Sequence, residues 1–484
     1  MTDIQEPHYT DNVQDHLIQV QNLLSQEALV DEVALRNQQV HPGEQENTEN
    51  WILSPHFVEL REKLSSLHPA DVAYILEALP ITQRLLVWDL VKAERDGEIL
   101  IEVSDAVRES LIATMSRDEL RVAAEQLDTD EIADLAPDLP HAVMRDLFRS
   151  LSIEEREQLR EAMSYPEDAV GALMDFDMVT IREDVTLEVV SRYLRRFEEL
   201  PDHTDQLFIV DRDDRFKGVL PLNLLLVNEP EMEVAKLMIT GAITLHPDDK
   251  ADLASQAFER YDLVSAPVVD EDSKLLGRVT VNTVMDFIRA ETESDVLNLA
   301  GLREDEDIFA SVWKSAKNRW LWLALNLCTA FFASRVIGSF EGTIEKFVAL
   351  ATLMPIVAGI AGNSANQTTT IIIRSLALAQ ITTVNARRMI RKELAIGFLN
   401  GLVWGSVAGL FAYYLYQNVL IGLIMTSAML LNLLLGAMAG LLIPLAMQRM
   451  GRDPAIGSSV MLTAITDSGG FFIFLGLATI FLIH

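Results

Sequence analysis

Residues 454–483 read PAIGSSVMLTAITDSGGFFIFLGLATIFLI, and this apolar stretch is long enough to cross a bilayer as one helix. It contains one acidic residue, Asp467, near its middle. A carboxylate at that depth costs roughly 2.5 to 3.5 kcal/mol on insertion scales, so such residues usually face a protein interior or a water-filled path rather than lipid. Asp467 is therefore a candidate cation ligand inside a membrane domain.

Two hydroxyl residues precede Asp467 at helical spacing. Thr463 lies one turn before it and Ser459 two turns before, so a helix would place all three on one polar stripe. The structural alternative is an ion pair between Asp467 and Arg335, the other charge within an apolar segment. Arg335 lies close to the end of its segment, where a long side chain can reach water instead. We therefore favour Asp467, Thr463 and Ser459 as ion-contacting residues.

The sequence predicts five transmembrane helices. Their expected ranges are 320–337, 347–373, 394–416, 420–447 and 455–483. Basic residues gather in the loops after the second and fourth spans, whereas the other two loops carry little positive charge. Because Lys and Arg are enriched in cytoplasmic loops, we expect the N-terminus inside the cell (inner) membrane and the C-terminus outside it. The first residues lack both a basic start and an apolar core, so no signal peptide is expected.

Charge divides the chain into two halves. The whole sequence has a net charge of −33, while the part from Arg319 onward has ten Lys and Arg against five Asp and Glu. The preceding residues therefore carry a net charge of −38. So acidic a surface repels nucleic acid and concentrates cations, although most charge runs are simply solvated faces. The single cysteine, Cys328, excludes an intramolecular disulfide and a cysteine-based zinc site.

The first 168 residues contain two kinds of sequence. Residues 1–54 are rich in Gln, Glu and Asn, and we expect a loosely ordered extension there, with some helix around Val13 to Ala34. Residues 55–168 consist of short amphipathic helices separated by prolines, and the segments 116–119 and 152–155 have the spacing of capping boxes. We expect an all-α domain of stacked helices. It offers no nucleophile with a base and no phosphate-binding loop, so its expected role is interaction or regulation.

Residues 169–291 contain an internal repeat. Phe208-Ile-Val-Asp211 recurs as Pro267-Val-Val-Asp270, and Lys217-Gly-Val-Leu220 recurs as Leu276-Gly-Arg-Val279, both at an offset of 59 residues. Each copy predicts a short strand, a helix and a hairpin with an acidic turn. These residues resemble a tandem pair of CBS domains, which is an α/β regulatory module.

The CBS family often binds adenosine nucleotides through a Gly-x-x-Thr-x-x-Asp ending. The second copy has Gly277 and Thr280 but Thr283 in place of the acid, and the first copy has Pro221 and Leu224 at the matching places. These departures place nucleotide binding in doubt.

Three strings extend the resemblance to most of the chain. They are Tyr165-Pro-Glu-Asp-Ala-Val-Gly-Ala-Leu-Met174, Met354-Pro-Ile-Val-Ala-Gly-Ile-Ala-Gly-Asn-Ser-Ala-Asn-Gln367, and Asp453-Pro-Ala followed by Thr463-Ala-Ile-Thr-Asp467. In this order they resemble the MgtE family of magnesium transporters and channels. The resemblance implies a homodimer with one Mg²⁺ path on its two-fold axis and Asp467 as the central ligand. Ser459 departs from a family position that can carry an amide.

The fold expected from this resemblance is multidomain, and the protein is not expected to be an enzyme. It combines an all-α stacked-helix domain, an α/β tandem CBS pair and an all-α transmembrane domain of five helices. The expected boundaries are 1–54 for the extension, 55–168 for the helical domain, 169–291 for the CBS pair, 292–318 for an acidic connecting (plug) helix and 319–484 for the transmembrane domain.

A polar and small-residue cluster opens the second span. It consists of Gly359, Gly362, Asn363, Asn366 and Gln367. These residues can line an ion path, or they can pack helices closely and hydrogen-bond across them. The packing interpretation is favoured over direct contact with the ion.

The connecting segment carries the candidate regulatory cation ligands Asp286, Glu291, Glu293 and Asp295. On a helix, Glu291 and Asp295 would lie one turn apart, where like charges repel by a few tenths of a kcal/mol. A divalent cation would relieve that repulsion. The resemblance implies that high internal Mg²⁺ bridges these acids to the helical and CBS domains and closes the path. The alternative for each acid is a solvated charge on a linker.

Two other classes of function remain open. The protein could be a membrane-anchored cation sensor that signals to a partner without transport, with Asp467 purely structural. It could also be a CBS-regulated anion channel, but the intramembrane Asp467 and the scarcity of basic residues in the spans disfavour that.

Overall fold

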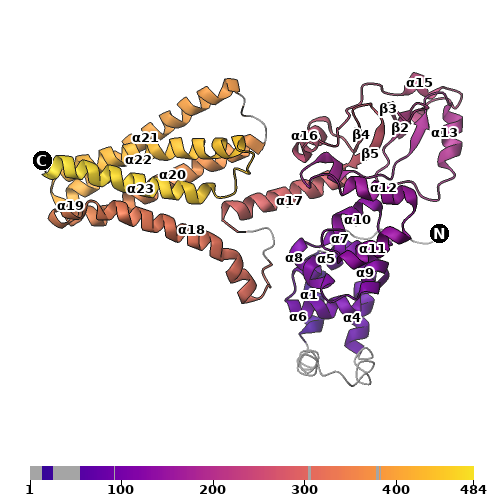
Figure 1. Ribbon diagram of the computed structural model, residues 1–484, viewed down its shortest axis with the longest axis horizontal. Coiled ribbons are helices and arrows are strands. Elements are labelled where there is room, and N and C mark those ends of the chain that lie inside the picture. Colours follow the sequence, from indigo (N-terminus) through magenta and orange to yellow (C-terminus); the bar gives the residue numbers. More distant parts are fainter. Residues whose placement is uncertain are drawn as a thin grey trace. The chain divides into compact units, whose positions relative to one another are not determined.

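The computed structural model describes residues 13–25, 55–91, 93–302, 307–377, 381 and 383–483. The chain forms two compact units. The N-terminal unit runs to Ile288 and includes Asp307–Ala310, while the C-terminal unit comprises Arg289–Glu306 and Ser311–His484. Figure 1 shows the helices and strands of both units.

The N-terminal unit begins with stacked short helices (Figure 1). They are α1 (Val13–Leu24), α4 (Pro55–Ser66), α5 (Pro69–Glu77), α6 (Ile81–Leu90), the 3₁₀ turn η1 (Ala93–Arg95), α7 (Asp96–Glu102), α8 (Asp105–Ile112), α9 (Arg117–Ala124), α10 (Thr129–Leu135), α11 (His141–Ser150) and α12 (Ile153–Ala162). Both expected capping boxes are present, at the starts of α9 and α12. A shared apolar core runs through these helices.

Helix α1 is a packed part of this domain. Its residues Val20 and Leu24 are buried in the core shared with α4 to α11. The helix expected around Val13 to Ala34 is thus present as Val13–Leu24, but it is not loosely ordered, because its apolar residues pack into the core of the domain. Most of the rest of the expected extension, residues 1–54, lies outside the described residues.

Two small sheets follow, one for each copy of the repeat. The elements are η2 (Val170–Leu173), β1 (Thr180–Arg182), α13 (Leu187–Leu194), β2 (Gln206–Val210), β3 (Phe216–Pro221), α14 (Leu222–Val227), α15 (Val234–Leu237), α16 (Ala251–Tyr261), β4 (Ser265–Val269) and β5 (Leu275–Thr280). Strand β2 pairs parallel with β1 and antiparallel with β3, and β4 pairs antiparallel with β5. Both hairpins shift register at matching places, Ile209/Val210 and Val268/Val269. The repeat seen in sequence is thus a repeat of structure.

Helix α17 (Val281–Leu299) leads from the second copy toward the membrane spans. It begins directly after β5, so the connecting helix starts earlier than the expected residue 292. It ends in a glycine cap: Gly301 has φ +73°, and the amide of Leu302 donates to the carbonyl of Leu297 at 2.9 Å. Glycine suits this place because the left-handed region costs it nothing.

Besides the second part of α17, the described residues of the C-terminal unit form five long helices and a short one. They are α18 (Val312–Gly338), α19 (Glu341–Lys346), α20 (Ala349–Ala377), α21 (Thr383–Tyr416), α22 (Val419–Arg449) and α23 (Ser458–Ala478), which continues as the π-helical turn Thr479–Ile483. Among the described residues, four of these are long and apolar enough to cross a membrane: α18, α21, α22 and α23 extended to Ile483. Helix α20 matches the expected second span in length, but its amides and hydroxyls make it less apolar.

Helix α22 is the centre of this unit. Fifteen of its residues are buried, and it packs against α20, α21 and α23. Helix α21 approaches it through glycines spaced four residues apart, at Gly397, Gly401, Gly405 and Gly409. A Cβ atom on Gly401 would lie 2.8 Å from the Cα atom of Leu430. The absence of side chains therefore sets the distance between the two helices.

Candidate ion site and regulatory surface

The polar stripe of α23 lies away from the helix's packed face. Leu462, Thr466 and Phe474 are buried against neighbouring helices. Thr463 is exposed, whereas Ser459 and Asp467 are partly buried. The Thr463 hydroxyl donates to the Ser459 carbonyl at 2.9 Å. All three predicted residues thus share one face, and a single chain leaves that face incompletely covered.

The carboxylate of Asp467 forms no hydrogen bond or ion pair within the described part of the chain. The alternative partner, Arg335, is exposed on α18 and does not pair with it. The structure therefore does not support the structural ion pair. Its long stem lets Arg335 reach solvent from near the end of its helix.

Helix α20 turns most of its predicted cluster outward. Gly359, Asn363, Asn366 and Gln367 are exposed, and a Cβ atom on Gly359 would meet no atom within 4 Å. A Cβ atom on Gly362 would lie 3.6 Å from the hydroxyl oxygen of Thr466. Gly359 therefore meets no other helix among the described residues of one chain, whereas Gly362 faces α23, and the choice between packing and ion contact stays a prediction.

The glycines that bring α20 and α22 together are on α22. A Cβ atom on Gly436 would lie 3.1 Å from that of Ala365, and the Thr369 hydroxyl donates to the Gly440 carbonyl at 3.2 Å. These contacts occupy the face of α20 opposite its exposed amides, so the amides stay on an uncovered surface.

Two buried polar residues of this unit were missed from the sequence. Glu393 of α21 is only 5 % exposed, and its Oε2 accepts a hydrogen bond from the Thr368 hydroxyl at 3.1 Å. Asn432 of α22 is fully buried; its Nδ2 donates to the Val357 carbonyl at 3.0 Å, while its Oδ1 has no partner. A carboxylate directly before an apolar run was the available signal for Glu393. For Asn432 a lone amide within such a run was the signal.

Acidic side chains of the helical domain lie beside acids of the CBS pair. Burial raises the pKa of Asp130 to about 8, and the charge of Asp175 adds to this. Desolvation also raises the pKa of Asp128, with further increases from Asp177 and Asp202. Each carboxylate therefore resists ionisation, and a cation between the two domains would favour the charged forms.

The connecting helix contributes to the same surface through Asp286. Although Asp134 lies at the surface, desolvation raises the pKa of its carboxyl to about 6; Arg108 opposes this, and Asp286 adds to it. Asp286 is thus placed next to the helical domain. The acids Asp128, Asp130, Glu131 and Asp134 within one short helix are the sequence signal for this surface.

The other predicted regulatory residues lie further along α17. Glu291 and Glu293 are exposed, and Asp295 is partly buried. The Glu293 carboxylate pairs with Arg289 one turn away at 3.3 Å. Within the described residues, no three His, Cys, Asp or Glu side chains lie close enough to hold a metal ion directly.

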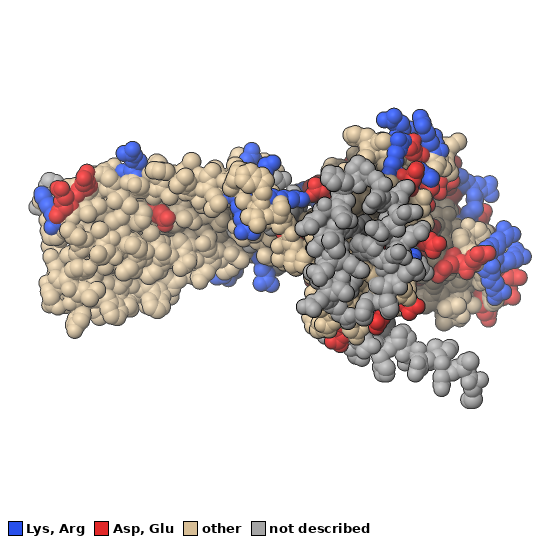
Figure 2. Space-filling view, turned by 90° about the horizontal axis from the view of Figure 1, so that it is seen from below, with Lys and Arg blue, Asp and Glu red and all other residues tan. Residues whose placement is uncertain are grey.

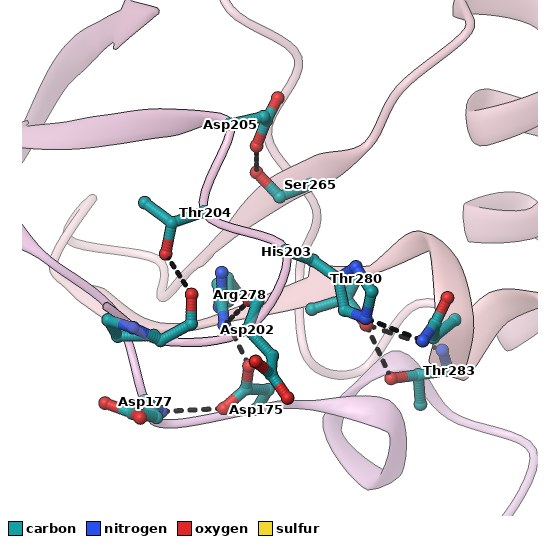
Figure 3. A network of polar contacts seen from close by, with 12 residues as sticks. Asp175, Asp177, Asp202, His203, Thr204, Asp205, Ser265, Arg278, Thr280 and Thr283 are labelled. Carbon is teal, nitrogen blue, oxygen red and sulfur yellow. Dashed lines mark hydrogen bonds and ion pairs between the residues drawn. The ribbon is translucent and has the colours of Figure 1, made fainter. Parts of the chain in front are cut away.

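Figure 3 shows the polar network at the base of the CBS pair. The buried guanidinium of Arg278 pairs with Asp175 at 2.8 Å and donates to the Asp202 carbonyl at 2.7 Å. In the nucleotide-motif positions, the hydroxyls of Thr280 and Thr283 bond to each other at 2.9 Å. Thr283 thus fills the place of an acid with a hydroxyl that already has a partner.

A second buried ion pair ties the connecting segment to the helical domain. Arg84 of α6 is fully buried, and its guanidinium makes two contacts to the carboxylate of Asp307, at 2.7 and 3.3 Å. Its Nε also donates to the Leu76 carbonyl at 2.9 Å. Asp307 is therefore a structural anchor, not a free acid of the linker.

Charge is distributed very differently over the two units. Figure 2 shows Asp, Glu, Lys and Arg crowded on the N-terminal unit, whereas the visible face of the C-terminal unit is largely uncharged. A membrane bundle with an unpaired carboxylate, preceded by a CBS-type pair and an acidic surface, defines the class of regulated membrane transport proteins for cations.

Sequence models of known families match the chain in the order of these parts. The MgtE intracellular N domain matches residues 67–168, the CBS domain matches 170–226 and 234–290, and MgtE, described as a divalent cation transporter, matches 354–477. The chain belongs to the MgtE family.

Curated relatives align with this chain over nearly its full length. The magnesium transporter MgtE of Thermus thermophilus is 29 % identical over 87 % of this chain and 95 % of its own, and that of Bacillus subtilis is 26 % identical over 88 % and 94 %. A solved cytosolic domain of the Mg²⁺ channel MgtE, in complex with ATP, is 31 % identical, with a TM-score of 0.43, and covers 47 % of this chain and 93 % of that one.

Proposed function

We propose that this protein is a Mg²⁺-selective transporter or channel of the cell membrane. The observation that carries the proposal is the carboxylate of Asp467, which lies in an otherwise apolar helix and has no partner among the described residues. Mg²⁺ gives up its waters reluctantly and prefers an octahedral shell of oxygens. A carboxylate next to the Thr463 hydroxyl and the Ser459 carbonyl offers such an ion hydrogen bonds to its waters.

The proposed assembly is a homodimer with one ion path on its two-fold axis. Two features support it: the Ser459–Asp467 face of α23 is incompletely covered, and the amides of α20 are exposed. A two-fold axis beside these faces would present two copies of Asp467 to one hydrated ion. The exposed Arg387, Arg388 and Arg391 at the start of α21 support a cytoplasmic N-terminal unit and an external C-terminus.

The proposed regulation is closure by cytoplasmic Mg²⁺. Burial is the main cause of the raised pKa values of Asp130 and Asp134, and the neighbouring acids Asp175 and Asp286 add to it, so these carboxylates also repel one another. Mg²⁺ between them would draw α10, the CBS pair and α17 together, and its loss would let them separate. The lack of a preformed direct metal cage within the described residues suits a cation held through its waters.

Transport is tested with purified protein in liposomes that contain a Mg²⁺-sensitive dye. We expect Mg²⁺ entry that empty liposomes lack and that rising Mg²⁺ on the side of the N-terminal unit suppresses. A folded dimer that binds Mg²⁺ but gives no flux at low Mg²⁺ would favour the alternative, a membrane-anchored sensor.

A further inference from the structure

The side chain of Trp322 lies against the end of the connecting helix α17 and against the start of α23, the helix that carries Asp467. Gly301 follows the connecting helix α17, and a Cβ atom there would lie 3.3 Å from Cγ of Trp322. Gly457 precedes α23, and a Cβ atom there would lie 3.2 Å from Cη2 of the same indole. Cγ and Cη2 are at opposite ends of the ring system, so one side chain spans both places.

Both positions require glycine for two reasons: the backbone there has a positive φ, and the indole leaves little room for a side chain. Gly301 has φ +73° and Gly457 has φ +76°, which other residues rarely adopt. Gly301 is buried and caps α17, whereas Gly457 is the residue from which α23 starts. Neither end can gain a side chain without moving the ring or straining the chain.

Trp322 differs from its neighbours on α18. Most of that helix is exposed in a single chain, including Trp320 and Leu321, yet Trp322 is partly buried. Trp320 instead stacks edge-on against Trp313, with ring centroids 5.3 Å apart. The two tryptophans therefore have different surroundings although only one residue separates them.

We propose that Trp322 is the positioning residue that couples the connecting helix to the ion site. A rigid indole held between two glycines transmits displacement, because neither contact has a flexible side chain to absorb it. Asp467 lies ten residues after Gly457 on the same helix, about 15 Å along its axis. A shift at the end of α17 thus reaches the Asp467 helix through one ring. This inference rests on the proposed transport and its regulation by Mg²⁺.

The test compares Trp322→Ala with Trp320→Ala in the full chain, using Mg²⁺ flux into liposomes. For Trp322→Ala we expect flux at low Mg²⁺ to persist while the inhibitory Mg²⁺ concentration rises about 5- to 150-fold, the usual range of coupling between sites. Trp320→Ala should leave that concentration unchanged. Equal shifts in both variants, no shift in Trp322→Ala, or loss of all its flux in a folded dimer would overturn the proposal.

A second measurement keeps the contact testable if the wild type does not transport. Amide hydrogen exchange of residues 298–302 should speed up in Trp322→Ala and stay at the wild-type rate in Trp320→Ala. Unchanged exchange in both variants would show that the ring does not hold the end of α17. Faster exchange together with absent wild-type flux would refute the transport function but leave the contact standing.

Discussion

At the scale of single residues, the buried charge of Arg84 is balanced by Asp307, which lies far away in the sequence. Its guanidinium is fully buried, and its countercharge Asp307 is 9 % exposed. Two opposite charges in such surroundings need each other, because removing one leaves the other buried without compensation. Asp307 is therefore fixed to the helical domain by its contact with Arg84.

We expect Asp307→Asn to destabilise the helical domain by about 3 to 5 kcal/mol, the usual cost of an orphaned buried charge. Hydrogen exchange of α5 and α6 in the full chain measures this. The double variant Arg84→Met with Asp307→Leu removes both charges and should recover most of the loss, while Asp272→Asn in an exposed hairpin turn serves as the control. A single variant as stable as the wild type would contradict the burial of this pair.

Asp130 gives the N-terminal unit an unusual dependence on pH. In the folded chain its carboxyl keeps a proton up to about pH 8, whereas its ordinary pKa is 3.8. The folded state thus binds more protons than the unfolded state between these values, so stability falls as pH rises through that window. In EDTA we expect the melting temperature of the N-terminal unit to drop from pH 5 to pH 8.5.

Asp130→Asn should flatten this drop, and Mg²⁺ at pH 8.5 should reverse part of it in the wild type. Both comparisons use the same thermal melts of the full chain. A wild type and variant with the same pH dependence would remove Asp130 from the cation-binding surface.

Sequence could identify residues whose chemistry clashes with their neighbours. Asp467 was visible because an acid in an apolar helix is anomalous, and Glu291 and Asp295 were visible as a run of like charge. Arg84 and Trp322 gave no such signal, since Arg and Trp are ordinary in amphipathic helices and near membrane surfaces. Their roles come from contacts with residues far away in the chain, which no local pattern contains.

At the scale of elements, the glycine stripe of α21 sets how closely it lies to α22. We expect Gly401→Ala to destabilise the C-terminal unit by about 1 to 3 kcal/mol, since the new methyl group would overlap Leu430. Thermal unfolding in detergent measures the effect. Gly476→Ala in α23 has open space around it and should change stability little. Equal effects at the two sites would contradict close packing at Gly401.

The five expected spans fall on α18 and α20 to α23, because long apolar runs leave few other structures in a membrane, and among the described residues four of these helices, all but α20, are apolar enough to cross one. Less could be predicted about which faces of these helices pack against one another. The cluster from Gly359 to Gln367 looked like a packing motif, yet its glycines are not the ones in the tight α20–α22 contact. Small residues permit close packing, but the partner helix decides which of them are used.

At the scale of the whole molecule, the two units differ in charge and have different proposed roles. The N-terminal unit concentrates acids whose mutual repulsion a divalent cation can relieve, and the C-terminal unit keeps Asp467, which has no partner in the described part of the chain, in an apolar bundle. Helix α17 joins the two along the chain: Asp286 lies beside the helical domain within the N-terminal unit, and the residue after the end of α17 lies against Trp322 within the C-terminal unit. The proposed function requires that a movement of α17 open or close the ion path.

The most direct measurement is Mg²⁺ flux into liposomes for Asp467→Asn beside the wild type and Glu345→Gln, an exposed acid of the same unit. The asparagine keeps the size of the side chain and removes its charge. We predict that Asp467→Asn loses at least about 90 % of the flux, since removing a hydrogen-bonding charge from an ion costs on the order of 1.5 to 3 kcal/mol. Glu345→Gln should transport like the wild type. A folded Asp467→Asn dimer with wild-type flux would contradict the account.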